Sequence, residues 1–227
     1  MKTIRRIAVI TMALGILLTV GVIVRPESAS AATKSTTSPN LIKNPGAEAG
    51  PGSSTGGVVP VPNWTETTGT GFTAVKYGAT GGGFPTLTSP GPPKRGSNFF
   101  AGGPDSDNDV AVQTISLSNY LSAIKAGKAS FSLAGWIGGS ASLNDSGFVE
   151  LDFKNQAGSL IGTSATLGPV TAAQRGNITG FLKKTTSGAV PKAARTAYLQ
   201  LSLFSATTGA PYNYGFADSL KLVIKTS

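Results

Sequence analysis

Two carboxylates near opposite ends of the chain could together hold a hard cation. Glu48 closes the segment 40–48, Asn-Leu-Ile-Lys-Asn-Pro-Gly-Ala-Glu, and Asp218 lies in the segment 214–220, Tyr-Gly-Phe-Ala-Asp-Ser-Leu. Each stands beside a predicted strand, and Ca²⁺ prefers carboxylate and carbonyl oxygens as ligands. The residue types leave two interpretations open: a calcium site that joins the first and last strands, or two surface carboxylates that never meet.

Aromatic and amide side chains on predicted strands form a second candidate site. Successive side chains of a strand point to opposite faces, so Trp136 points away from Leu133 and Ile137, and Tyr198 and Gln200 point away from the leucines of their own strand. An aromatic ring can stack on the apolar C–H face of a sugar while amides and carboxylates bond its hydroxyls. We predict that Trp136, Tyr198 and Gln200 bind sugar on a solvated sheet face. The alternative is that a loop from residues 50–103 covers Trp136, which then extends the core.

The residues for catalysis are few. The chain has no His and no Cys, which excludes Ser-His-Asp and Cys-His arrangements and removes the usual zinc ligands. Glu150 and Asp152 share one face of a predicted strand, as a glycosidase pair would need, but their alternation with Lys154 favours a solvated charge stripe. The acidic stretch 105–109, Asp-Ser-Asp-Asn-Asp, lacks the glycine and glutamate of a calcium loop and is interpreted as an acidic turn. The sequence therefore predicts no enzyme.

The elements that must position these residues are almost all strands. Residues 50–103 are dense in Gly, Pro, Ser and Thr, which predicts long loops with short strands. After Asp109 the apolar residues recur with period two, and a single short helix is expected at 117–126, capped by Ser118 and ended by Gly127. The pattern predicts a two-sheet antiparallel architecture. The expected strands are 110–117, 128–137, 148–155, 177–184, 196–204 and 216–224.

The first residues predict a targeting signal. Residues 1–6 are basic, residues 7–24 are almost wholly apolar, and the small residues 29–31 suit signal cleavage, although the apolar run is long enough for an uncleaved anchor. We expect a signal peptide over 1–31, a flexible leader over 32–39, and one domain over 40–227. After cleavage no membrane segment is expected, and the predicted location is secreted, either extracellular or associated with the cell envelope.

Charge and cysteine content limit the partners. The chain carries a net charge of +9, and removal of residues 1–31 takes away Lys2, Arg5, Arg6, Arg25 and Glu27, which leaves +6. This balance favours anionic polymers, but no run of basic residues exceeds two, so nucleic acid is not expected as a partner. Without cysteine no disulfide can form, so packing or a metal ion must stabilise the fold.

The opening segment 40–48, the Pro-Asn-Trp at 62–64 and the closing Gly-Phe-Ala-Asp-Ser-Leu at 215–220 resemble those of galactose-binding-like jelly-roll carbohydrate-binding modules. The resemblance spans nearly all of residues 40–225. It implies an all-β jelly-roll sandwich and a structural calcium ion held by Glu48 and Asp218. The chain departs from the family pattern at Ala47, where Phe is usual, and at Asp218, where two acids often stand.

The expected function is non-catalytic binding of a polysaccharide or glycoconjugate. Two alternatives stay open. A structural or adhesive protein could use the same sandwich to dock on anionic cell-wall polymers or other envelope proteins. A lyase or glycosidase would need Glu150 and Asp152 to converge in a cleft.

Overall fold

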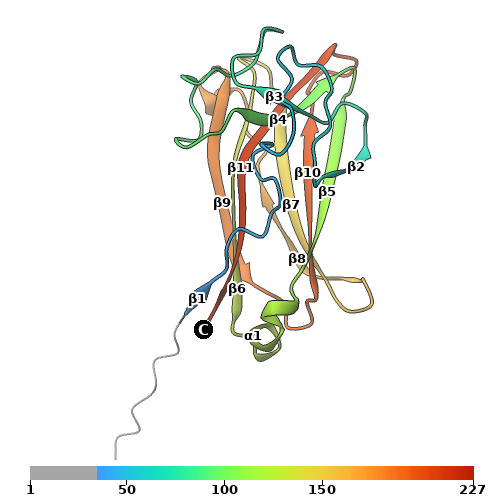
Figure 1. Ribbon diagram of the computed structural model, residues 1–227, viewed down its shortest axis with the longest axis vertical. Helices are drawn as coiled ribbons and strands as arrows, with labels where there is room; N and C mark the ends of the chain where they lie inside the picture. Colours follow the sequence, from blue (N-terminus) through green and yellow to red (C-terminus); the bar gives the residue numbers. More distant parts are fainter. Residues whose placement is uncertain (1–34) are drawn as a thin grey trace, which may run out of the picture. The chain divides into compact units, whose positions relative to one another are not determined.

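A computed structural model describes residues 35–227 of the chain, and the predicted signal peptide at 1–31 lies outside the described residues. The described part is built almost entirely from antiparallel strands (Figure 1). The strands are β1 (Thr36–Thr37), β2 (Thr65–Thr68), β3 (Thr73–Lys76), β4 (Asn98–Pro104), β5 (Asn108–Ser116), β6 (Ala129–Gly139), β7 (Ser146–Lys154), β8 (Leu160–Leu167), β9 (Gly180–Ala189), β10 (Thr196–Phe204) and β11 (Tyr212–Thr226).

The strands form two facing sheets. Sheet A has the order β3-β4-β11-β6-β9, with β1 added beside β11, and sheet B has the order β2-β5-β10-β7-β8. The eight strands β4 to β11 thus divide between the sheets as β4-β11-β6-β9 and β5-β10-β7-β8, which is the jelly-roll arrangement. The predicted fold class, an all-β antiparallel jelly-roll sandwich, is confirmed.

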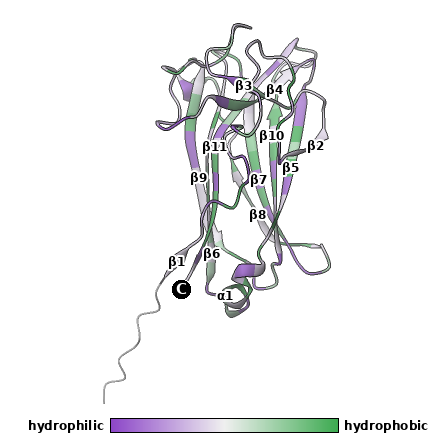
Figure 2. Cartoon of the chain, in the orientation of Figure 1, coloured by the Kyte–Doolittle hydropathy of each residue, from purple (hydrophilic) through white to green (hydrophobic). Residues whose placement is uncertain are grey.

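The interior between the sheets is filled by the residues that the period-two pattern assigned to it. Leu199, Leu201 and Leu203 of β10 are fully buried, as are Leu133 and Ile137 of β6. Buried and half-buried residues alternate along most of β6, β7 and β10, and Figure 2 shows both hydrophobic and hydrophilic residues on the strands. These three strands therefore each contribute one face to a common core and one face to the outside of the sandwich.

Sheet A carries a second apolar cluster on its outside. This aromatic cluster consists of Val75, Phe84, Phe99, Ala101, Phe181 and Phe216. The Phe99 ring lies 5.1 Å from that of Phe216 and 5.9 Å from that of Phe181, both edge-on. Strand β4 is consequently buried on both faces, which explains why its Asn-Phe-Phe-Ala-Gly-Gly-Pro sequence lacks the alternation that identified the other strands.

The helical prediction is confirmed in part. A 3₁₀ turn (Ser118–Tyr120) precedes the helix α1 (Leu121–Ala126), and Gly127 ends α1 in the left-handed conformation at φ 72°. The side chain of Ser118 does not cap the helix. A second 3₁₀ turn lies at Ala173–Arg175.

The expected strands agree with β5, β6, β7, β10 and β11, but three differences stand out. Strand β8 was not predicted, because an edge strand of small residues has no hydrophobic period. Strand β9 begins and ends later than the expected 177–184, because its Thr- and Ser-rich half was not recognised. The sheet also begins earlier than Asn40: Thr36 pairs with Thr226, and Ser38 N–H donates to the Ile224 carbonyl at 2.9 Å, so the end of the expected flexible leader is part of sheet A.

Candidate functional site

Tyr198 and Gln200 lie together on the outer face of sheet B. They project from β10, the central strand, on the side opposite its buried leucines, and both are half-buried. The strand register places Tyr198 opposite Asp152 and Gln200 opposite Glu150, both on β7. We call these four residues, with the half-buried Phe148 of β7, the B face. The predicted pairing of an aromatic ring with an amide on a solvated face is present.

Three of the B-face side chains, those of Tyr198, Asp152 and Gln200, have a defined polar neighbour. The Lys154 ammonium lies 3.7 Å from the centroid of the Tyr198 ring, within cation–π range. Ser164 of β8 donates to Asp152 Oδ1, and Gln200 Nε2 donates to Ser202 Oγ at 3.2 Å. A ligand that stacks on this side of the Tyr198 ring must therefore displace Lys154.

Phe148 was not predicted for this face, although the alternation along β7 indicates it. Phe148 alternates with Val149 and Leu151 and so shares the outward side of β7 with Glu150 and Asp152. It pairs with Ser202 on β10, one row from Gln200. The B face thus presents two aromatic rings, one amide and two carboxylates on neighbouring strands.

Trp136 lies elsewhere. It belongs to β6 in sheet A, so it points out of the opposite side of the sandwich, and the prediction that Trp136, Tyr198 and Gln200 share one surface is wrong. Strand alternation distinguishes inward from outward residues, but it does not say which sheet a strand joins. Trp136 is half-buried and packs against the aromatic cluster, in line with the alternative that the indole extends the core.

The fold brings Glu48 and Asp218 together from opposite ends of the described chain. A Cβ atom added to Gly46 would lie 3.0 Å from Asp218 Oδ1 and 4.0 Å from Glu48 Cγ, so the two side chains border the same small space. The Glu48 carboxylate accepts the N–H groups of Ser97 at 3.1 Å and Asn98 at 2.9 Å. The two side chains therefore lie near each other, and the calcium site that they were predicted to form stays a prediction.

Asp218 is a buried acid whose surroundings raise its pKa. It is 1% exposed, and its Oδ2 accepts the Tyr77 hydroxyl at 2.6 Å. Burial raises the pKa of Asp218 to about 6, although the hydrogen bonds from Tyr77 and Ser219 lower it, and the charge of Glu48 raises it further. Burial and the charge of Asp218 also raise the pKa of Tyr77, so its hydroxyl stays protonated as the donor.

The backbone beside each carboxylate is strained. Ala47 precedes Glu48 with φ 61°, and Ser219 follows Asp218 with φ 50°, a left-handed conformation that non-glycine residues seldom adopt. Such strain is concentrated at functional sites, where surrounding structure enforces it.

The residues around the pair suit a hard cation. The two carboxylates are oxygen ligands of the kind that Ca²⁺ prefers, and the neighbouring Asn98, whose backbone N–H donates to Glu48, has a buried Oδ1 that accepts no hydrogen bond. Between residues 35 and 227 no three acidic or histidine side chains gather closely enough to form a metal site by themselves. Backbone carbonyls would have to complete the ligand set.

The acids of the 105–109 stretch maintain loop structure. Asp109 is fully buried and accepts the Gly71 N–H at 2.8 Å, the Ser106 hydroxyl at 2.8 Å and the Asn213 amide at 3.1 Å. Asp107 accepts the Gly209 N–H at 2.8 Å. The interpretation as an acidic turn is confirmed.

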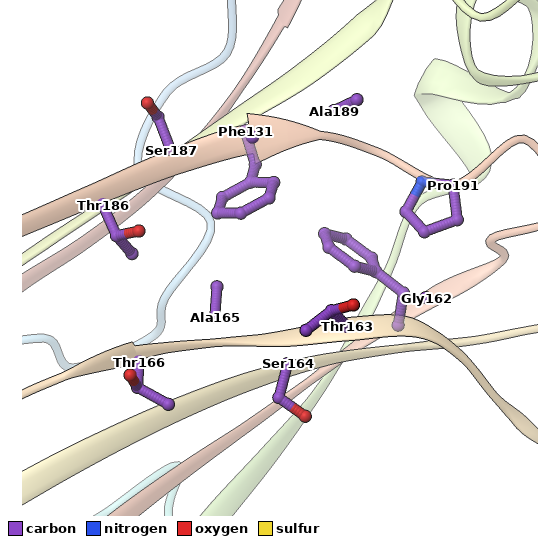
Figure 3. Close-up of a pocket in the computed structure, with 12 residues that line it drawn as sticks. Phe131, Gly162, Thr163, Ser164, Ala165, Thr166, Thr186, Ser187, Ala189 and Pro191 are labelled. Carbon is purple, nitrogen blue, oxygen red and sulfur yellow. The ribbon is translucent and has the colours of Figure 1, made fainter.

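A groove between the edge strands β8 and β9 was not predicted from the sequence. Its volume is about 580 Å³, and the Phe131 ring faces into it between walls of threonine and serine (Figure 3). The Phe153 ring lies 5.5 Å from the Phe131 ring and is tilted by 54° to it. The lining contains no charged residue, and it shares none with the B face.

Within residues 35–227 no helix is both long enough and apolar enough to cross a membrane.

No family model matches the chain, and no curated protein matches its sequence. Among solved structures it is similar to the enzymatically active domain of bacteriophage CBA120 tailspike protein 4, with 15% identity and a TM-score of 0.49 over 81% of this chain and 21% of that one. The chain therefore spans about a fifth of the tailspike structure.

Carbohydrate-binding modules are also among the similar structures. TmCBM61, solved with beta-1,4-galactotriose, is 16% identical with a TM-score of 0.45 over 82% of this chain and 98% of that one. A family 16 carbohydrate-binding module is 16% identical with a TM-score of 0.48 over 81% and 99%. Identities and TM-scores this low assign neither a ligand nor an activity to the chain.

Proposed function

We propose that the protein is a secreted, non-catalytic carbohydrate-binding domain that holds a polysaccharide or glycoconjugate on the B face. The observation that carries this proposal is the placement of Tyr198, Gln200, Glu150 and Asp152 in adjacent rows of one open sheet face. Secretion is inferred from the signal-like residues 1–31.

The chemistry of the B face suits a neutral sugar. The phenol ring of Tyr198 offers a flat apolar surface for the C–H face of a pyranose once Lys154 moves aside. Glu150 and Asp152 accept hydrogen bonds from sugar hydroxyls, and the Gln200 amide both donates and accepts. Binding is expected to be weak, because a few exposed contacts must offset the cost of ordering the ligand.

The same residues support binding rather than hydrolysis. Glu150 and Asp152 are two positions apart on one strand, about 7 Å by the usual strand rise, and both point out of the same face. Glycoside hydrolysis requires two carboxylates on opposite sides of the bond to be cleaved, which neighbours on one flat strand face do not provide.

Glu48 and Asp218 would hold a structural calcium ion, together with backbone carbonyls. The ion would neutralise the buried carboxylate of Asp218 and the exposed carboxylate of Glu48, which otherwise repel each other. Because the two residues come from opposite ends of the described chain, the ion would tie the opening segment to β11.

The test is binding of the protein, produced from its full-length sequence, to a panel of immobilised neutral polysaccharides with calcium and with chelator. Tyr198→Ala and Gln200→Ala should each lower the affinity about tenfold or more for the glycan that binds, equivalent to about 1.4 kcal/mol. Trp136→Ala, which removes an aromatic ring from the opposite sheet, is the matched control and should leave the affinity unchanged.

Loss of binding in Trp136→Ala but not in Tyr198→Ala would overturn the assignment to the B face. Retention of binding by both Tyr198→Ala and Gln200→Ala would do the same. Calcium is tested by thermal unfolding: calcium should raise the Tm of the wild type but not that of Glu48→Gln.

A further inference from the structure

Beyond the aromatic cluster, toward the C-terminal end of β11, the outer side of sheet A forms a flat track of small and basic residues. Three rows cross β9, β6 and β11 and are fixed by the strand register. We call these residues the A face: Lys183, Trp136 and Asp218 in the first row, Thr185, Ala134 and Lys221 in the second, and Ser187, Ser132 and Val223 in the third. Lys225 follows on β11 in the next row, opposite Ser130.

The charge of the A face is positive. Lys183, Lys221 and Lys225 are exposed, whereas the one acid in these rows, Asp218, is 1% exposed and accepts the Tyr77 hydroxyl. The three ammonium groups therefore face solvent without an exposed carboxylate in the same rows. Such a surface attracts anions, and the attraction weakens as salt is added.

The shape of the A face suits an extended chain. Strands β9 and β11 lie on either side of β6, about 10 Å apart by the usual strand spacing. The floor between the lysines is made of Ala134 and Ser132, whose side chains are short. Along β11, Lys221 and Lys225 are four positions apart, about 13 Å by the usual strand rise.

Trp136 at the upper end of the track gives the surface a preference for sugar. The indole is half-buried, with one neighbour, Lys183, exposed. A pyranose can stack on the indole while a carboxylate on the sugar pairs with the lysine. A polyanion without sugar rings would gain only the charge interaction.

We propose that the A face binds a polyuronate, a linear polysaccharide whose sugars carry carboxylate groups. This surface is separate from the B face, because the two lie on the outer sides of different sheets. It also gives a location to the docking on anionic wall polymers that the basic composition suggested.

The experiment measures binding of the protein, produced from its full-length sequence, to immobilised polygalacturonate, with polyphosphate as a sugar-free polyanion. The variant Lys183→Gln/Lys221→Gln/Lys225→Gln should lose at least tenfold in affinity for polygalacturonate. The matched control Lys76→Gln/Lys125→Gln/Lys192→Gln removes the same charge from exposed positions elsewhere and should lose less than threefold. Equal losses in both triple variants would show that net charge alone drives binding, and would overturn the proposal.

Two single variants test the track and the sugar preference. Thr185→Asp places a negative charge at an exposed position next to Lys183 on β9 and in the same row as Lys221, so the variant should fold normally and weaken polygalacturonate binding at least fivefold. Trp136→Ala should weaken binding to polygalacturonate but not to polyphosphate, with thermal unfolding as the check that the variant is folded. An equal effect on both polymers, or no effect of Thr185→Asp, would contradict the proposal.

The outcome is distinguishable from that of the neutral-glycan experiment. Tyr198→Ala should leave polygalacturonate binding unchanged, and the triple lysine variant of the A face should leave neutral-glycan binding unchanged. A loss of both activities in either variant would overturn the assignment to two surfaces.

Discussion

Sheets A and B show the same alternation of buried and outward residues, yet their outer sides differ in charge and in cover. The outer side of sheet B is open and carries Glu150 and Asp152 beside Tyr198. On sheet A the upper part is covered by the aromatic cluster, and the lower part carries exposed lysines with Trp136 at the boundary. The core constrains only inward positions, so the outward positions of each sheet are free to serve a different purpose.

The largest expected difference between the two sides is in stability. Phe99→Ala removes a fully buried ring from the aromatic cluster and should lower the free energy of unfolding by about 3–5 kcal/mol. Phe148→Ala removes a half-buried ring from the B face and should cost less than about 1.5 kcal/mol, because much of that ring is already in water. Urea unfolding measures both. Equal costs would show that the outer side of sheet B is also a packed core.

The next effect is a pH dependence of the free energy of unfolding that arises from Asp218, the buried acid on the outer side of sheet A. The pKa of Asp218 is about 6 in the folded protein and has an ordinary value of 3.8. The folded state therefore binds the proton more tightly than the unfolded chain, so without calcium the free energy of unfolding should decrease as the pH rises from about 4 to about 6. The expected loss is on the order of 2–3 kcal/mol, and Asp218→Asn should abolish it.

Added calcium should change this pH dependence of the free energy of unfolding. Because calcium binds the ionised carboxylates, its addition should restore the stability that the metal-free protein loses as the pH rises from about 4 to about 6. Chemical unfolding over pH 4–7, with calcium and with chelator, measures both effects. A pH dependence that is the same in the wild type and in Asp218→Asn would contradict this role of Asp218.

The smallest effect concerns the lysine that covers Tyr198. Lys154→Ala removes the cation–π contact at 3.7 Å and should cost about 0.5–1 kcal/mol of stability. The same change uncovers the ring, so the affinity for a neutral glycan should rise a few-fold. Lys183→Ala on the opposite side is the control and should leave glycan affinity unchanged. A fall in glycan affinity for Lys154→Ala would instead mean that Lys154 bonds the ligand directly.

The sequence by itself determined the fold class and much of its detail. Strict alternation in β7 and β10 assigned inward and outward side chains correctly, and Gly127 marked the end of α1. These features depend on local chemistry: the period of a strand, and the freedom of glycine to adopt a left-handed conformation. The chemical nature of Glu48 and Asp218 as cation ligands was likewise readable from residue type.

Only the tertiary structure decided which of these residues meet. Trp136 and Tyr198 follow the same local pattern, but β6 and β10 join different sheets, so the two rings point in opposite directions. Glu48 and Asp218 approach each other because the opening segment runs beside β11, with the Leu220 N–H donating to the Pro45 carbonyl at 2.9 Å. Sheet membership and the burial of β4 on both faces arise from contacts between residues far apart in the chain. Strand alternation carries no information on such contacts, and this is why the sequence predicted one mixed surface where the fold has two.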